Sequence, residues 1–72
     1  ALGYPEEAET VYRQALAIDP AQRATLNNLG DNLRLRNFFA EARQLLVRAL
    51  AVSPDYPEAH NNLGCLLRSI GE

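Results

Sequence analysis

The sequence of 72 residues contains no methionine, tryptophan or lysine, and it has only one cysteine, one histidine and five aromatic residues. A single Cys and a single His cannot form an internal disulfide or a structural zinc site. Seven arginines against nine acidic residues give a formal net charge of −2. This balance argues against nucleic-acid binding, which requires a dense basic face. No apolar run approaches the ~20 residues of a membrane span, and no signal-peptide pattern opens the chain.

The residues that are present are typical of a folded soluble protein, since 47% are hydrophobic and 22% are charged. Because the chain does not begin with Met, we expect it to be an excised or trimmed segment of a longer protein. A single Cys is compatible with either a reducing or an oxidising compartment, so the cysteine content does not identify the compartment. Of the possible locations, we expect the cytoplasm first. No residue pattern calls for a cofactor.

The chain repeats itself with a period of about 34 residues. The shift that places Asn27-Asn28-Leu29-Gly30 on Asn61-Asn62-Leu63-Gly64 makes twelve of the 38 aligned positions identical. Within each repeat the apolar residues have helical spacing, as in Leu26, Leu29 and Leu33. The pattern predicts four helices, at about 5–18, 21–35, 38–52 and 55–70. Because the connections are short, neighbouring helices must be antiparallel.

Proline, glycine and asparagine mark the breaks between the expected helices. Pro20, Pro54 and Pro57 are expected near helix starts, where Pro is best tolerated. Asp55 with Glu58 forms a candidate capping pair, and Ser53 is the rival cap. Residues that enter left-handed backbone at low cost recur once per repeat, which predicts tight turns between antiparallel helices at Gly3, Asn37 and Gly71.

These residues together resemble the tetratricopeptide repeat family over essentially the whole chain. The resemblance is carried by Leu26, Leu29-Gly30, Leu33, Ala42, Leu46, Ala49 and Pro54, with half-units on either side. It implies an all-α, right-handed α-solenoid fragment of antiparallel helix-turn-helix repeats. Residues 1–20 would then hold the second helix of a partial repeat, 21–54 a complete repeat, and 55–72 the first helix of another partial repeat. Among such repeats, the pattern is closest to those of the O-linked N-acetylglucosamine transferases.

The small residues of the pattern are expected to let helices approach closely, while larger residues fill the space between them. The small residues are Ala8, Ala15, Gly30, Ala42, Ala49 and Gly64, and the larger ones are Leu29, Leu33, Leu46 and Tyr12. The phase of the repeat leaves the first and last helices without a hairpin partner. We therefore expect open apolar surface at Val11, Tyr12 and Leu16 at one end, and at His60, Leu63 and Leu67 at the other.

The residues needed for catalysis are missing, so we expect no enzymatic activity. Cys65 and His60 lie five residues apart on one expected helix, which separates their side chains by roughly 140° around its axis. Ser53 and Ser69 have no partner pattern. The paired carboxylates Glu6 and Glu7 belong to a first helical turn, where they interact favourably with the helix dipole.

The family resemblance implies a concave groove, lined by the first helix of each repeat, that holds an extended peptide or a partner helix. The groove-facing residues would be Asn27, Asn28, Asp31, Arg34 and Leu35 from one repeat, and Asn61, Asn62, Cys65, Arg68 and Ser69 from the next. Asn28 and Asn62 are the first candidates, because an amide side chain matches a peptide bond whatever the sequence of the peptide. They resemble the asparagine ladder of the O-linked N-acetylglucosamine transferases. Alternatively they are solvated or bond to each other's helices.

The sequence thus predicts a protein–protein interaction module with a peptide or protein partner. A second hypothesis is a self-assembly element whose terminal half-repeats pair between chains, as an oligomer or a domain-swapped dimer. A third is the substrate-recruiting part of a larger enzyme such as a glycosyltransferase.

Overall fold

The computed structural model describes residues 4–71, which form four α-helices and no strand. The helices are α1 (Pro5–Ile18), α2 (Arg23–Leu35), α3 (Phe39–Val52) and α4 (Pro57–Ser69). The bounds of α3 lie one repeat period after those of α1, and the bounds of α4 lie one period after those of α2. The predicted all-α fold of helical repeats is confirmed.

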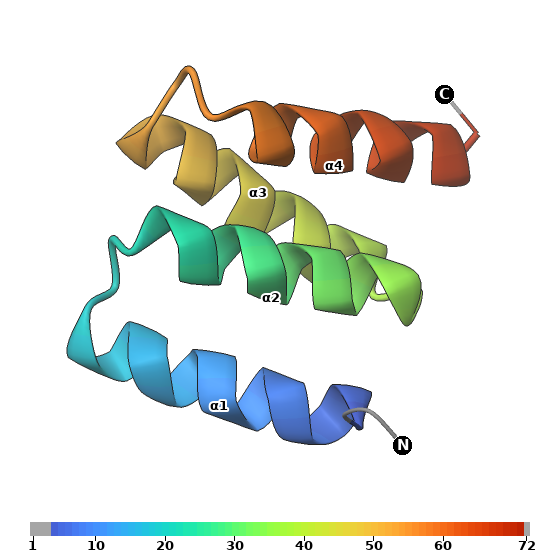
Figure 1. Ribbon diagram of the computed structural model, residues 1–72. Helices are drawn as coiled ribbons and strands as arrows, with labels where there is room; N and C mark the ends of the chain where they lie inside the picture. Colours follow the sequence, from blue (N-terminus) through green and yellow to red (C-terminus); the bar gives the residue numbers. More distant parts are fainter. Residues whose placement is uncertain (1–3, 72) are drawn as a thin grey trace.

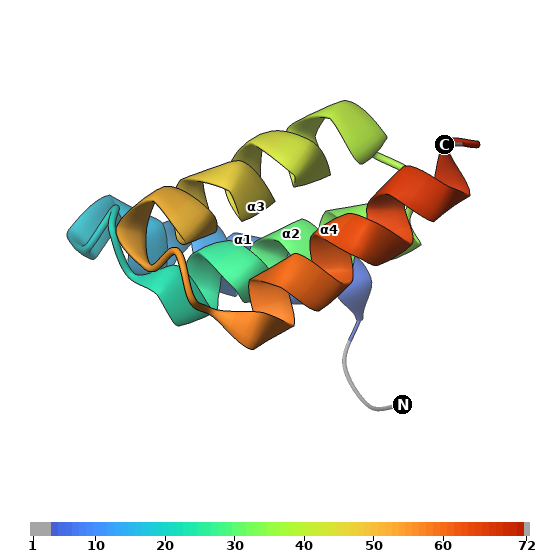
Figure 2. The ribbon, with the colours of Figure 1, turned by 90° about the horizontal axis from the view of Figure 1, so that it is seen from above.

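Helix α2 occupies the centre of the molecule and contacts the other three helices. Figure 1 shows successive helices running in opposite directions, so that α2 and α4 lie side by side and point the same way. Helix α3 forms a separate layer behind them, as the view from above shows (Figure 2). The chain therefore presents one face made of α2 and α4, and on the other side of α2 the Arg13–Glu41 ion pair joins α1 to α3.

The hydrophobic core lies mainly between α2 and α3. One side of α2, with apolar residues at positions i, i+3 and i+7, faces the apolar side of α3. The buried residues of the core are Leu26, Leu29, Leu33, Ala42, Leu45, Leu46, Ala49, Ala59 and Leu66. Helix α1 contributes no fully buried residue, although Tyr12 and Leu16 pack against the core. The stability of the fold therefore depends chiefly on the α2–α3 hairpin.

Gly30 allows α2 and α3 to approach closely, as the sequence predicted. A β-carbon at Gly30 would lie 2.9 Å from Cδ2 and Cγ of Leu46 and 3.4 Å from the carbonyl oxygen of Ala42. Gly64, its counterpart on α4, differs because a β-carbon there would meet only the Arg68 side chain, at 3.9 Å. Ala8 and Ala15 on α1 are likewise half-exposed. The close contact expected at these positions is thus present only in the α2–α3 hairpin.

The turns use left-handed backbone where the sequence predicted it. Asn37, between α2 and α3, has a φ of 69°, and Gly71, after α4, has a φ of 87°. Asparagine and glycine adopt this conformation at the lowest cost. The corresponding prediction for Gly3 lies outside the described residues.

The predicted helix starts need correction. Helix α2 begins at Arg23 and α4 at Pro57, two residues later than expected. The reason is that Pro20 and Pro54 belong to the preceding turns. In these turns the Gln22 N–H donates to the Asp19 carbonyl oxygen, and the Tyr56 N–H donates to the Ser53 carbonyl oxygen. The capping pair of Asp55 and Glu58 was wrong, since Tyr56 is the residue before the first helical position and no side chain caps the helix. Ser53 instead ends α3. Helices α3 and α4 also differ from the prediction by one residue at one end each.

The apolar side of α4 also differs from the prediction. Leu66 is its fully buried leucine, whereas Leu63 and Leu67 are half-buried. Leu66 belongs to the hydrophobic core. Its counterpart one repeat earlier is the polar Asn32, so the repeat pattern did not predict a buried leucine at this position. Val11 and His60 are exposed as expected, while Tyr12 and Leu16 are half-buried.

The two glycines give a matched test of the packing. We expect Gly30→Ala to lower the free energy of unfolding by about 1–2 kcal/mol, because overpacking against Leu46 outweighs the gain in helix propensity. Gly64→Ala should raise it by about 0.5–1 kcal/mol, because only the propensity changes. Urea unfolding followed by circular dichroism measures both. A Gly30→Ala variant as stable as Gly64→Ala would contradict the close approach.

Candidate functional site

The exposed sides of α2 and α4 form one continuous surface, which we call the α2–α4 face. It consists of Asn28, Asp31 and Leu35 on α2, and Asn62, Cys65 and Ser69 on α4. Each trio has the i, i+3, i+7 spacing of one helical side, and on α2 this side is nearly opposite the leucines that enter the core. All six residues were predicted from the sequence to face the groove, and they are exposed or half-exposed.

An asparagine pair joins the two helices of this face. The Nδ2 of Asn62 donates a hydrogen bond of 2.9 Å to the Oδ1 of Asn27. Asn27 is only 6% exposed, so it lies between the helices and not on the open surface where the sequence analysis placed it. Asn28 is exposed on the face, and Asn61 is exposed on α4. The repeated Asn-Asn motif therefore puts its two residues into different environments.

Charged residues lie along the rim of the α2–α4 face. The Arg34 guanidinium donates to Asp31 Oδ1 at 2.6 Å, and the Arg34 side chain is 18% exposed. On α4 the guanidinium of Arg68 donates to the Cys65 sulfur at 3.3 Å. Ser69 Oγ donates to the Cys65 carbonyl oxygen at 2.9 Å. Arg34 and Arg68, which occupy equivalent positions, are thus each held against the residue three positions earlier.

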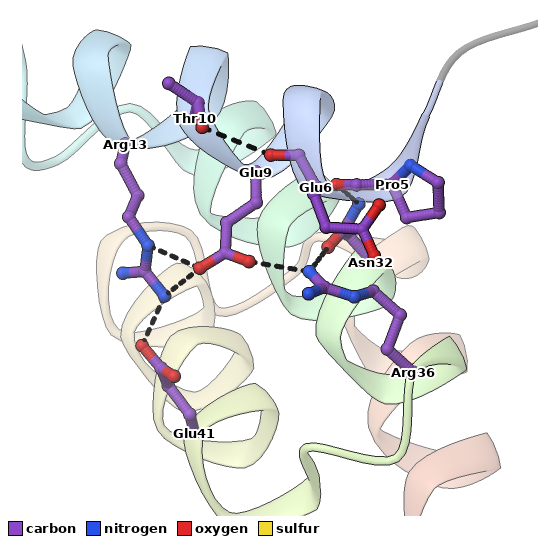
Figure 3. A network of polar contacts seen from close by, with 8 residues as sticks. All are labelled: Pro5, Glu6, Glu9, Thr10, Arg13, Asn32, Arg36 and Glu41. Atoms are coloured by element: carbon purple, nitrogen blue, oxygen red, sulfur yellow. Dashed lines mark hydrogen bonds and ion pairs between the residues drawn. The ribbon is translucent and has the colours of Figure 1, made fainter.

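A network of charged side chains connects α1, α2 and α3 on the other side of the molecule (Figure 3). Glu9 accepts from Arg36 at 2.6 Å and from Arg13 at 2.7 Å, and Arg13 also reaches Glu41 at 2.7 Å. Arg36 donates to Asn32 Oδ1 as well. Sequence analysis missed this network, although Glu9 and Arg13 have the i, i+4 spacing of a helical ion pair.

The network shifts the proton affinities of its members. The hydrogen bonds from Arg36 and Arg13 hold the pKa of Glu9 below its ordinary value. The hydrogen bonds to Glu41 and Glu9 raise the pKa of Arg13. Both shifts favour the charged forms of Glu9 and Arg13.

The residues considered for catalysis have structural partners. His60 forms a hydrogen bond of 2.7 Å with the Pro54 carbonyl oxygen through Nε2, and Cys65 lies beside Arg68. Within residues 4–71 no three His, Cys, Asp or Glu side chains are grouped so that they could hold a metal ion. None of the four helices is long and apolar enough to cross a membrane.

Two family models match the sequence. A model described as TPR repeat matches residues 30–71, and a model described as Tetratricopeptide repeat matches residues 1–22. The searches of curated proteins and of solved structures found no significant match. The longer of the two matches covers more than half of the chain, including the whole of α3 and α4.

The charged network makes a pH-dependent prediction. Because the pKa of Glu9 is lower in the folded chain than its ordinary value of 4.5, ionised Glu9 stabilises the fold above that value, and the contribution is lost as the pH falls through the folded pKa. Glu9→Gln should therefore lower the free energy of unfolding by about 0.5–1 kcal/mol at neutral pH. The difference from the parent chain should shrink in acid.

Urea unfolding of both chains at a series of pH values checks this. Glu6→Gln is the matched control, because Glu6 lies on the same helix and its carboxylate forms no ion pair within residues 4–71. Equal pH profiles for Glu9→Gln and Glu6→Gln would show that the network does not stabilise the fold.

Proposed function

Because the chain belongs to the tetratricopeptide repeat family, whose repeats generally serve as protein–protein interaction modules, we propose that it binds an extended peptide or a partner helix on the α2–α4 face. This face corresponds to the concave side of the repeat array that the family resemblance implies. The observation that supports the proposal is an exposed row of amide, charged and apolar groups beside the hydrogen bond from Asn62 to the buried Asn27.

Asn28 is the residue of the face best suited to a peptide main chain. Its side chain is exposed, and an amide offers two N–H donors and one acceptor oxygen to a peptide bond. Leu35, two turns along the same side of α2, is 66% exposed and provides apolar contact area. A bound peptide would thus meet a polar group and an apolar group on one helix.

Asn62 contributes differently from Asn28. One of its N–H groups is used by Asn27, and this bond fixes the orientation of the amide at the edge of the face. The amide retains a second donor for a peptide bond. In this proposal Asn27 positions Asn62, and Asn61 lies at the outer edge. In this proposal amide side chains contact the main chain of a peptide, which is the kind of contact made by the asparagine ladder that the sequence resembles.

The rim residues set the polarity of the proposed site. Arg34 and Asp31 neutralise each other, whereas Arg68 donates to the Cys65 sulfur and forms no ion pair within residues 4–71. A partner with a carboxylate above α4 would meet Arg68 at an exposed position, where a single ion pair adds modest affinity.

A peptide selected from a random library against the folded chain tests the role of Asn28. We expect Asn28→Ala to weaken binding roughly fivefold or more, because the hydrogen bonds of the amide are lost. Isothermal titration calorimetry measures the affinity, and circular dichroism checks that the helices remain intact.

Gln14→Ala is the matched control, since it removes an exposed amide from α1, outside the α2–α4 face. Unchanged affinity in Asn28→Ala, or an equal loss in Gln14→Ala, would exclude Asn28 as a peptide contact. Asn62→Ala is less informative alone, because it also breaks the bond to Asn27.

A second candidate function, pairing between copies of the chain, is favoured by the two end helices. Helix α4 presents Gly64 at the position where α2 presents Gly30, and α1 presents Tyr12 at the position where α3 presents Leu46. A β-carbon at Gly64 would meet only the Arg68 side chain, at 3.9 Å, and Tyr12 is half-buried. Packing α4 of one copy on α1 of another would therefore repeat the α2–α3 contact, with Tyr12 against Gly64.

Light scattering after size exclusion, over a wide range of concentrations, tests this pairing. We expect a mass above 8.0 kDa that rises with concentration, and a monomer for Gly64→Leu, whose side chain would occupy the place of Tyr12. Circular dichroism should show a folded Gly64→Leu chain because its β-carbon would meet only the Arg68 side chain. A monomeric parent chain at every concentration would exclude the pairing.

A further inference from the structure

A cleft of about 350 Å³ lies between α1 and α3. Helices α1 and α4 lie on opposite sides of α2 (Figure 1). It shares no residue with the α2–α4 face. Its lining comes from two helices and consists of Arg13, Leu16 and Ala17 on α1, and Glu41, Gln44, Leu45 and Arg48 on α3. The volume is at the lower end of the range that binds small ligands or single side chains.

One end of the cleft is neutral and held in place. Arg13 on α1 and Glu41 on α3 form an ion pair of 2.7 Å across it, and Arg13 is also bound by Glu9. The middle is apolar, because Leu45 is buried and Leu16 is half-buried. An apolar side chain of moderate size would find hydrophobic contacts there.

The other end of the cleft carries a positive charge without a counter-charge. The Arg48 guanidinium donates to the Pro20 carbonyl oxygen at 3.2 Å, and it forms no ion pair within the described residues. Asp19, the neighbour of Pro20 in the same turn, accepts from the Ala21 N–H through its carboxylate and forms no ion pair with Arg48. Arg48 therefore keeps donors and full charge for an anionic group entering the cleft.

The repeat does not itself require these arginines. In the neighbouring repeat, Arg48 corresponds to Gln14 and Arg13 to Val47, whereas Leu45 corresponds to the apolar Val11 and Leu16 to Leu50. The apolar residues of the cleft thus have apolar counterparts in the other repeat, whereas neither Arg13 nor Arg48 has a charged counterpart. Packing explains the leucines, and the bond to the Pro20 carbonyl oxygen uses one donor of Arg48 without neutralising its charge.

We propose that this cleft binds a short acidic segment of a partner protein, with an apolar side chain against Leu16 and Leu45 and a carboxylate on Arg48. The Gln44 amide, which lines the same wall, provides donors and an acceptor for the main chain of the segment. This second interaction surface is independent of the one proposed on α2 and α4, so the two can hold different partners at once.

Nuclear magnetic resonance titration of the ¹⁵N-labelled chain with the capped peptide acetyl-Phe-Glu-Leu-Glu-amide tests the proposal. We expect saturable shifts in the backbone signals around Leu16, Leu45 and Arg48. The peptide with both Glu residues replaced by Gln should bind roughly fivefold more weakly, because the charge interaction with Arg48 is lost.

Substitutions at two arginines of α3 separate the cleft from general charge effects. Arg48→Gln should weaken binding of the acidic peptide roughly fivefold, and Arg48→Lys should restore most of the affinity. Arg43→Gln makes the same charge change on the same helix outside the cleft, and it should leave the affinity unchanged. Equal effects at Arg43 and Arg48, equal binding of the two peptides, or no saturable shifts would overturn the proposal.

Asn28→Ala distinguishes the two surfaces. Binding of the acidic peptide in the cleft should be the same in this variant as in the parent chain. Shifts that follow Asn28 and α4 in place of Leu16 and Leu45 would assign the peptide to the α2–α4 face and refute the cleft.

Discussion

The close approach of α2 to α3 at Gly30 is the constraint on which the other contacts depend. Leu46 fills the space that any side chain at Gly30 would take, and this lets Leu29 and Leu33 reach the core from the same side of α2. Because α2 also contacts α1 and α4, the hairpin fixes where both end helices can pack. The distance between two backbones thus determines the shape of both exposed surfaces.

The sequence was sufficient to predict the helices, the turn at Asn37 and the packing of Gly30, because each depends on local conformation or on a spacing that recurs in every repeat. The helix starts near Pro20 and Pro54 were misplaced, since proline is as compatible with the preceding turn as with the first helical residue. The sequence left open that Asn62 bonds to the helix of Asn28, and it does so, but its partner, Asn27, could not be derived. The bond joins the second asparagine of one motif to the first asparagine of the other, and that offset is set by how the helices lie beside each other.

The α1–α2 and α3–α4 junctions occupy equivalent positions in the repeat but differ in chemistry. At the α1 side, Glu9, Arg13 and Arg36 form the charged network, and their counterparts at the α3–α4 side are Arg43, Val47 and Ile70. Exposed ion pairs add little to stability. The network is therefore better understood as an orienting device, because its Arg13–Glu41 pair joins α1 directly to α3 across a cleft.

The asparagines show how one repeated motif can serve both stacking and binding. Asn27 and Asn62 are used between α2 and α4, so stacking alone accounts for one residue of each Asn-Asn pair. Asn61, the counterpart of Asn27, is exposed on α4. It would accept the same hydrogen bond from an asparagine of a further helix. Asn28 is at once the counterpart of Asn62 and an exposed residue. One N–H group of its amide can donate to a preceding helix in the manner of Asn62 or to a peptide, and the two uses exclude each other at that N–H group.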